Sequence, residues 1–169
     1  MKKEIEQALS ILIGQPLISA NRALDLEMFD FGQKHQILTR QGKEKEVGEF
    51  TIHIQCTWRI TRQTRILVAS KDRWYPGDES KDIPDDFDWS LPGNRLDKRI
   101  SAFFQNIREP LLVKSVRADK VGGFTLRFVN SFMLEVFPDN SSNDEYWRFF
   151  QLSRNTKHFV VAGSGIQEA

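Results

Sequence analysis

The side chains best suited to bind another molecule lie on one face of residues 49 to 61. In this segment His53 supplies an imidazole, Gln55 an amide and Arg59 a guanidinium. Successive side chains of a β-strand point to opposite faces, so these three odd-numbered residues would share one face of a strand. Such a face can recognise a partner, although antiparallel sheets routinely leave one face in water. The opposite, apolar face is formed by Phe50, Ile52, Ile54, Cys56, Trp58 and Ile60.

Three further residues are candidates for the same surface. Trp74 and Tyr75 form an aromatic corner shortly after this segment, and Arg148 lies in a strand that is apolar on both faces. Because a lone buried cation is costly, we expect Arg148 to pair with a carboxylate, with Glu135 as the first candidate and Glu27 as the second. The predicted partner- or ligand-binding residues are therefore His53, Gln55, Arg59, Trp74, Tyr75 and Arg148.

Nucleophilic catalysis is not indicated by any motif. Cys56 lies on the apolar face, where we expect it to be buried rather than ionised. The Gly-Ser-Gly run at 163–165 lacks the strand and helix of a serine nucleophile elbow, and the glycine pair at 122–123 lacks the lysine and helix of a phosphate-binding loop. We therefore predict no catalytic residue and interpret the chain as non-enzymatic. A hydrolase site assembled from dispersed residues is the alternative.

Metal and cofactor sites are no better indicated. The three histidines, His35, His53 and His158, are far apart in the sequence, so a zinc or iron site would have to be assembled in space. Residues 72–89 contain seven acidic residues, but they lack the spacing of an EF-hand. We interpret this segment as a long solvated acidic loop. The sequence thus predicts neither a metal nor a cofactor.

Composition limits the compartment and the partner. The 24 Lys and Arg residues nearly balance the 23 Asp and Glu residues, so no overall field attracts nucleic acid. The single cysteine excludes an intramolecular disulfide and favours a reducing compartment. No run of 18 apolar residues is present, and the N-terminus lacks the apolar core of a signal peptide. We expect a cytoplasmic protein that does not enter a membrane.

The N-terminal half is predicted to begin with an amphipathic helix at about 3–13. Residues 22–32 alternate as a half-buried strand, with Leu and Met on one face and the acids Asp25 and Glu27 on the other. This pair could support acid–base chemistry, but we interpret it as part of a solvated face. The polar residues 33–46 are predicted to separate this strand from the next.

The remaining elements complete a mainly antiparallel α+β fold. Within residues 65–70 the run 66–69 has no polar face, which predicts a deeply buried strand. Asn94 with Asp97 can cap a mid-chain amphipathic helix. From about 163 the chain is predicted to be a flexible tail. We interpret residues 1–169 as a single domain. Further strands, joined as meanders, are predicted at 111–116, 124–129, 132–137, 145–152 and 158–162.

Four segments of the chain have a distinctive sequence: Gly48-Glu49-Phe50-Thr51-Ile52-His53-Ile54-Gln55-Cys56-Thr57-Trp58-Arg59-Ile60, Leu134-Glu135-Val136-Phe137-Pro138-Asp139, Glu145-Tyr146-Trp147-Arg148-Phe149-Phe150 and His158-Phe159-Val160-Val161. Together they resemble a small family of uncharacterised bacterial proteins without an established activity. The chain has Thr57 where members of that family carry proline. The resemblance implies an interaction module or an immunity partner, and it supplies no catalytic residue.

The sequence therefore favours a non-enzymatic bacterial protein–protein interaction domain, of an immunity or regulatory type. The alternative is a small-molecule binding domain whose pocket is lined by His53, Gln55, Arg59 and Arg148.

Overall fold

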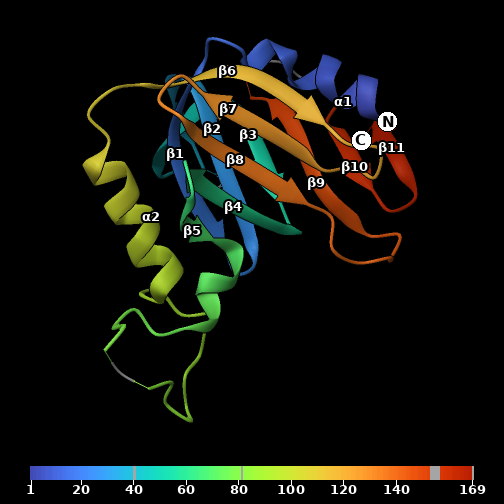
Figure 1. The fold of residues 1–169 in the computed structure, drawn as a ribbon. Coiled ribbons are helices and arrows are strands. Elements are labelled where there is room, and N and C mark those ends of the chain that lie inside the picture. The colour runs from blue at the N-terminus through green and yellow to red at the C-terminus, as the bar shows by residue number, and fades with distance from the viewer. Residues whose placement is uncertain (40, 81, 153–156, 169) are drawn as a thin grey trace.

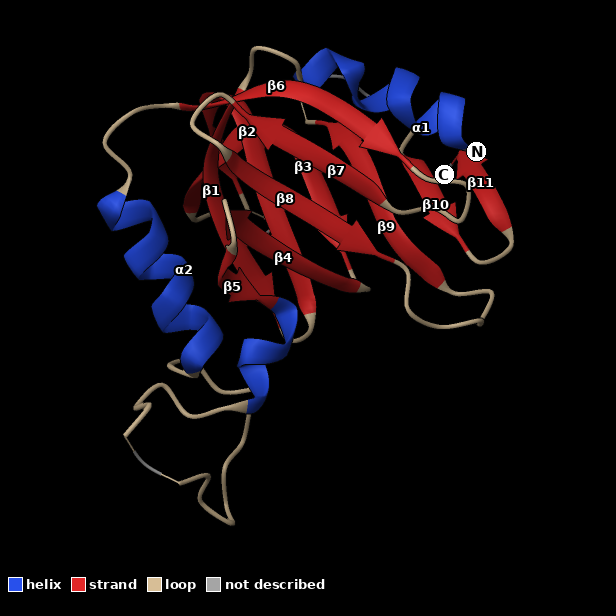
Figure 2. Ribbon diagram, viewed as in Figure 1, coloured by secondary structure: helices blue, strands red, loops and turns tan. Residues whose placement is uncertain are grey.

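The computed structural model describes residues 1–39, 41–80, 82–152 and 157–168. Its strands form one antiparallel sheet in the order β11-β10-β9-β3-β2-β1-β6-β7-β8-β4-β5. Two α-helices and two short 3-10 helices within these residues accompany the sheet (Figure 2). The α+β class with a mainly antiparallel sheet is confirmed.

The elements follow one another along the chain with short connections, apart from residues 75–94. The helical elements are α1 (Lys2–Leu9), η1 (Ser10–Leu12), η2 (Ser70–Trp74) and α2 (Arg95–Asn106). The strands are β1 (Pro16–Ala23), β2 (Leu26–Leu38), β3 (Glu44–Ile54), β4 (Thr57–Arg62), β5 (Arg65–Ala69), β6 (Leu111–Ala118), β7 (Phe124–Phe128), β8 (Phe132–Phe137), β9 (Glu145–Gln151), β10 (Phe159–Ala162) and β11 (Gly165–Glu168).

The sheet folds over on itself into two halves. The half from β11 to β1 joins the half from β6 to β5 through a short pairing of β1 with β6, at Pro16 with Leu112 and Leu17 with Leu111. Figure 1 shows β6, β7 and β8 lying across β2, β3 and β9. The inner faces of the two halves therefore face each other and enclose the core.

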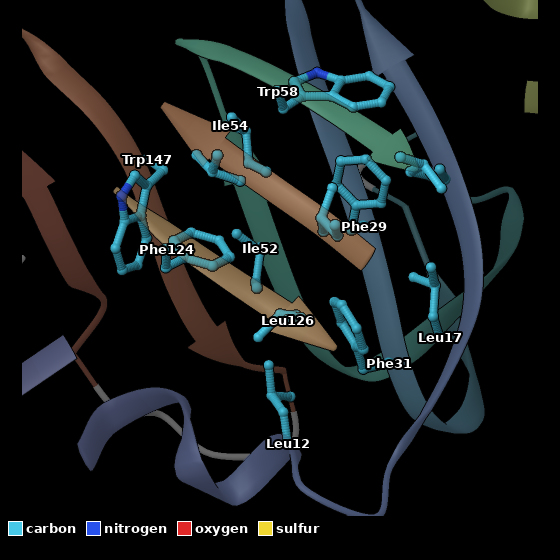
Figure 3. Close-up of a cluster of buried hydrophobic side chains, with 14 of the residues drawn as sticks. Leu12, Leu17, Phe29, Phe31, Ile52, Ile54, Trp58, Phe124, Leu126 and Trp147 are labelled. Carbon is cyan, nitrogen blue, oxygen red and sulfur yellow. The ribbon is translucent and has the colours of Figure 1, made fainter. Parts of the chain in front are cut away.

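Large aromatic side chains fill the space between the halves (Figure 3). Trp58 on β4 meets Phe29 on β2 edge to face, with ring centroids 5.0 Å apart. Trp147 on β9 packs against Phe124 on β7 at 4.8 Å, and its indole N–H donates a 2.7 Å hydrogen bond to the Gly122 carbonyl. Each pair joins one half to the other, so these contacts hold the folded-over sheet closed.

The alternating segment is two strands rather than one. The amides of Gln55 and Cys56 both donate to the carbonyl oxygen of Tyr146, at 2.9 and 3.2 Å. This two-to-one pairing bends the chain, as a β-bulge does, and carries it from β3 in one half to β4 in the other. Cys56 is buried as predicted, and burial raises the pKa of its thiol to about 12.

The first predicted strand differs in its bounds and its faces. The chain turns at Leu24, which has a φ of 57°, so residues 22–32 contain the end of β1 and the start of β2. The inward residues of β2 are Glu27, Phe29 and Phe31 rather than Leu26 and Met28. Most of the polar stretch 33–46 belongs to β2 and β3, because the two strands extend as a paired ribbon.

Two other predictions are corrected by the pairing of the strands. We predicted deep burial for residues 65–70, but β5 lies at the end of the strand order and Ile66 is 54% exposed. Where we predicted a flexible tail, residues 165–168 form β11 and pair with β10. An apolar run without a polar face can thus mark an edge strand, and a polar run can add a strand to an open edge.

The two α-helices pack against different parts of the sheet. Ile5 and Leu9 of α1 are buried, and the helix contacts β6. In α2 the Asn94 side chain accepts a 3.1 Å hydrogen bond from the Asp97 amide, which confirms the predicted cap. Helix α2 lies beside β1 and β5 (Figure 1). Within the described residues no helix is long and apolar enough to cross a membrane.

The Trp58 contact is expected to contribute strongly to stability. Trp58→Ala would leave a cavity beside Phe29 and should lower the free energy of unfolding by about 3 to 5 kcal/mol. The measurement is equilibrium denaturation by urea followed by circular dichroism. Leu38→Ala, at an exposed position of β2, is the control and should change stability by less than about 0.5 kcal/mol. Equal losses in the two variants would contradict a core role for Trp58.

Candidate functional site

The structure divides the predicted polar face between the two halves of the sheet. His53 lies on β3, Gln55 is exposed at the bend and Arg59 lies on β4. The Arg59 guanidinium makes a two-point ion pair with Glu135, at 2.9 and 3.2 Å, and lies over the ring of Phe137 at 5.0 Å. The contacts of Arg59 are therefore with residues of β8, and neither Glu135 nor Phe137 contacts His53 in the interactions described below.

His53 belongs instead to a cluster on β3 and β9. It stands opposite Arg148 in the register of the two strands, and its ring meets Phe150 edge to face at 4.9 Å. Phe150 stacks on His158 at 4.2 Å, and the His158 Nδ1 atom lies 3.3 Å from an Arg148 nitrogen. Desolvation, with a smaller effect of the Arg148 charge, lowers the pKa of His53.

Arg148 is ion-paired, but with neither of the predicted carboxylates. Its guanidinium bonds both oxygens of Glu145, with Nε 2.6 Å from Oε1. Glu135 stands opposite Arg59 in the β4–β8 register, and Glu27 is on the inner side of β2. Glu145 is three residues before Arg148 on β9, so the pair forms locally. Across the described parts of the chain, no three His, Cys, Asp or Glu side chains are grouped as a metal site.

Trp74 and Tyr75 lie away from His53, at the end of η2 beside the start of α2. Trp74 meets Trp89 at 4.7 Å between ring centroids, and the Arg95 guanidinium lies over the Tyr75 ring at 4.4 Å. The Arg95 amide also donates a 2.9 Å hydrogen bond to the Tyr75 carbonyl. Trp74 and Tyr75 are nevertheless 46% and 41% exposed. These four residues form what we name the aromatic platform.

The acidic segment, residues 76–80 and 82–91, follows Tyr75 and projects beyond the sheet (Figure 1). Glu79 pairs with Arg99 at 3.0 Å, which fixes one point of the segment to α2. Asp82, Asp85 and Asp86 are exposed and make no ion pair with any residue that the structure describes. Their charge is therefore directed to solvent next to the exposed rings.

Glu27 is a further candidate, although the alternation of residues 22–32 predicts a solvated face for it. It is only 3% exposed, and desolvation raises the pKa of its carboxyl to about 8, although Arg73 and Arg22 act in the opposite direction. Strong pKa shifts caused by burial are typical of functional sites. The sequence does contain a signal for the burial of Glu27. Residues 27, 29 and 31 are alternate positions of one strand, so Glu27 lies on the same face as the apolar Phe29 and Phe31.

The comparisons with known proteins identify no relative. No protein-family model matches the chain, and no curated protein and no solved structure has significant similarity to it. The functional assignment therefore depends on the geometry of these surfaces.

The buried Glu27 carboxyl should make stability depend on pH. The unfolded chain releases this proton at about pH 4.3, whereas the folded protein holds it until about pH 8. Between these values the folded state binds more protons, so stability falls as the pH rises. Glu27→Gln cannot ionise and should be more stable than the parent at pH 8, by on the order of 5 kcal/mol.

Urea denaturation of both proteins at pH 5, 6, 7 and 8 measures this difference. The matched control is Glu44→Gln, at an exposed position of β3, whose stability should follow that of the parent. A constant difference between Glu27→Gln and the parent across this range would show that the Glu27 carboxyl ionises as an ordinary surface acid does.

Proposed function

We propose that the protein is a protein–protein interaction domain that binds a basic partner through the aromatic platform and the adjoining acidic segment. The observation that carries the proposal is the exposure of two large aromatic side chains that are already held in place. Trp74 rests on Trp89, and Tyr75 lies under Arg95. Trp, Tyr and Arg are the residues most enriched at the energetic centres of protein interfaces.

Fixed aromatic side chains suit binding for an entropic reason. A side chain that is immobilised before contact loses little conformational freedom on association, so more of the contact energy appears as affinity. Trp74 and Tyr75 are held by ring contacts and by the backbone hydrogen bond from Arg95 to Tyr75. The aromatic platform is therefore preorganised for binding.

The charge beside the platform selects the kind of partner. Asp82, Asp85 and Asp86 would repel nucleic acid and attract a basic protein surface, which would speed the encounter. An immunity-type function is one form of this activity, in which the acidic segment covers a basic surface of a toxin. The His53–Arg148 cluster and the Arg59–Glu135 pair are less suited to this task, because both are internally paired.

The proposal is tested by mapping the partner and then measuring its affinity. A photocrosslinking amino acid placed at Tyr75 in cells of the source organism should capture a specific protein, whereas the same probe at Lys114, an exposed site on β6, should not capture it. With the purified partner, Trp74→Ala should weaken binding by about 30-fold, as expected at an interface centre. Binding should also weaken as salt is added.

Two controls separate binding from folding. Ile66→Ala removes a similarly exposed apolar side chain from β5 and should leave the affinity unchanged. Each variant should keep the parental melting temperature within a few degrees, because the substituted side chains are exposed. The proposal would be overturned by a partner that binds Trp74→Ala and the parent equally well, or that crosslinks at Lys114 alone.

A further inference from the structure

A groove separates β1 from α2 on the side of the molecule where the helix lies against the sheet. Its volume is about 620 Å³, within the range of small-molecule sites. Its lining includes a charged cluster of Glu27, Arg22 and Asp97. The apolar part of its wall is formed by Ile18, Ala20, Leu96, Ile100 and Phe104.

The three groups of this charged cluster differ in how many hydrogen bonds they already make. All five N–H donors of Arg22 are used, in bonds to Asp97 and to the carbonyls of Leu24, Ser90 and Leu91. The Asp97 oxygens accept from Arg22 and from the Gly93 amide. These two side chains are therefore committed to holding α2 in place and have little capacity left for a ligand.

The Glu27 carboxyl is different. Glu27 is 97% buried, lines the groove and receives no hydrogen bond from the residues that the structure describes. The enclosed side-chain polar atoms that lack a partner among the described residues are His35 Nε2 and Arg95 Nε, and the Glu27 oxygens are not among them, so the carboxyl opens into the groove. A polar group in this position gains from a ligand that supplies a hydrogen bond. Glu27 is therefore the group at which a ligand can be recognised.

We propose that this groove binds a small amphipathic carboxylate, whose apolar chain lies against Ile100 and Phe104 and whose oxygen accepts a hydrogen bond from the Glu27 carboxyl. This ligand site is separate from the aromatic platform, and it differs from the pocket of His53, Gln55, Arg59 and Arg148 that the sequence suggested.

The surrounding charges favour an anion at this point. Burial raises the pKa of Glu27 to about 8, so at pH 7 the carboxyl is mostly neutral and can donate its proton in a hydrogen bond. Arg73 from η2 and Arg22 from β1 face it as cations, against Asp97 from α2 as the one anion that acts on it. Asp25 is exposed and acts mainly on Arg73. A carboxylate is attracted to this excess of positive charge, and an ammonium group is repelled.

The test uses three probes with the same eight-carbon chain: octanoate, 1-octanol and octylammonium. Isothermal titration calorimetry on the full chain at pH 7 should rank octanoate first and octylammonium last. Between pH 7 and pH 9 octanoate itself stays ionised, whereas the protonated fraction of Glu27 falls about tenfold. Binding to the parent should weaken by the same factor, about tenfold.

Two comparisons between proteins test whether octanoate binds at Glu27 and in this groove. Glu27→Gln keeps an N–H donor that does not titrate, so it should bind octanoate within about threefold of the parent at pH 7 and equally well at pH 9. Ser101→Trp should block the groove and abolish binding, whereas Ala102→Trp, at an exposed neighbour on α2 outside the groove lining, should not.

Three results would overturn the proposal. They are tighter binding of octylammonium than of octanoate, octanoate affinity in the parent that is unchanged between pH 7 and pH 9, and octanoate binding that survives in Ser101→Trp. None of them bears on the aromatic platform, whose partner is measured separately.

Discussion

The carbonyl oxygen of Tyr146 accepts hydrogen bonds from two successive amides, those of Gln55 and Cys56, and the two-half architecture depends on this bend. Without it, β3 and β4 would continue as one strand within one half of the sheet. With it, β3 pairs with β9 and β4 pairs with β8, so the chain crosses from one half of the sheet to the other. Trp58 and Ile54, on either side of the bend, can then both face the same core (Figure 3).

Arg22 has a comparable function outside the core. It connects β1 to the turn at Leu24, to the loop carbonyls of Ser90 and Leu91, and to Asp97 in the first turn of α2. A two-point bond between Arg and a carboxylate fixes orientation as well as distance. The same side chain thus holds one wall of the groove and the return of the acidic segment toward α2. The proposed ligand site and the proposed protein-binding surface share this anchor, although they use different residues for recognition.

Most of the elements could be predicted because their signals are local. The Asn94 cap and the apolar stripe of α2 are within one helix, and the hairpin at Asn130 and Ser131 is defined by its own turn. The bend at Gln55 could not be predicted in this way, because its cause is a carbonyl 91 positions away in the sequence. The prediction that Arg148 pairs with Glu135 is wrong for the same reason. Glu135 pairs with Arg59, and that pairing depends on the register of β4 and β8. The sequence pattern places His53 and Arg59 on one surface because it does not show the bend between them.

Glu27 shows how a violated pattern can be more informative than a regular one. Leu24, Leu26 and Met28 make the even positions look apolar, but Leu24 belongs to a turn, and Leu26 and Met28 are only half-buried in β2. In β2 the apolar residues of the core are the odd ones, Phe29 and Phe31, and Glu27 precedes them on the same face. The fold therefore takes a carboxyl out of water where a leucine or valine would contribute more to stability. Places where a chain departs from its own pattern at a cost in stability are the places where function is to be sought.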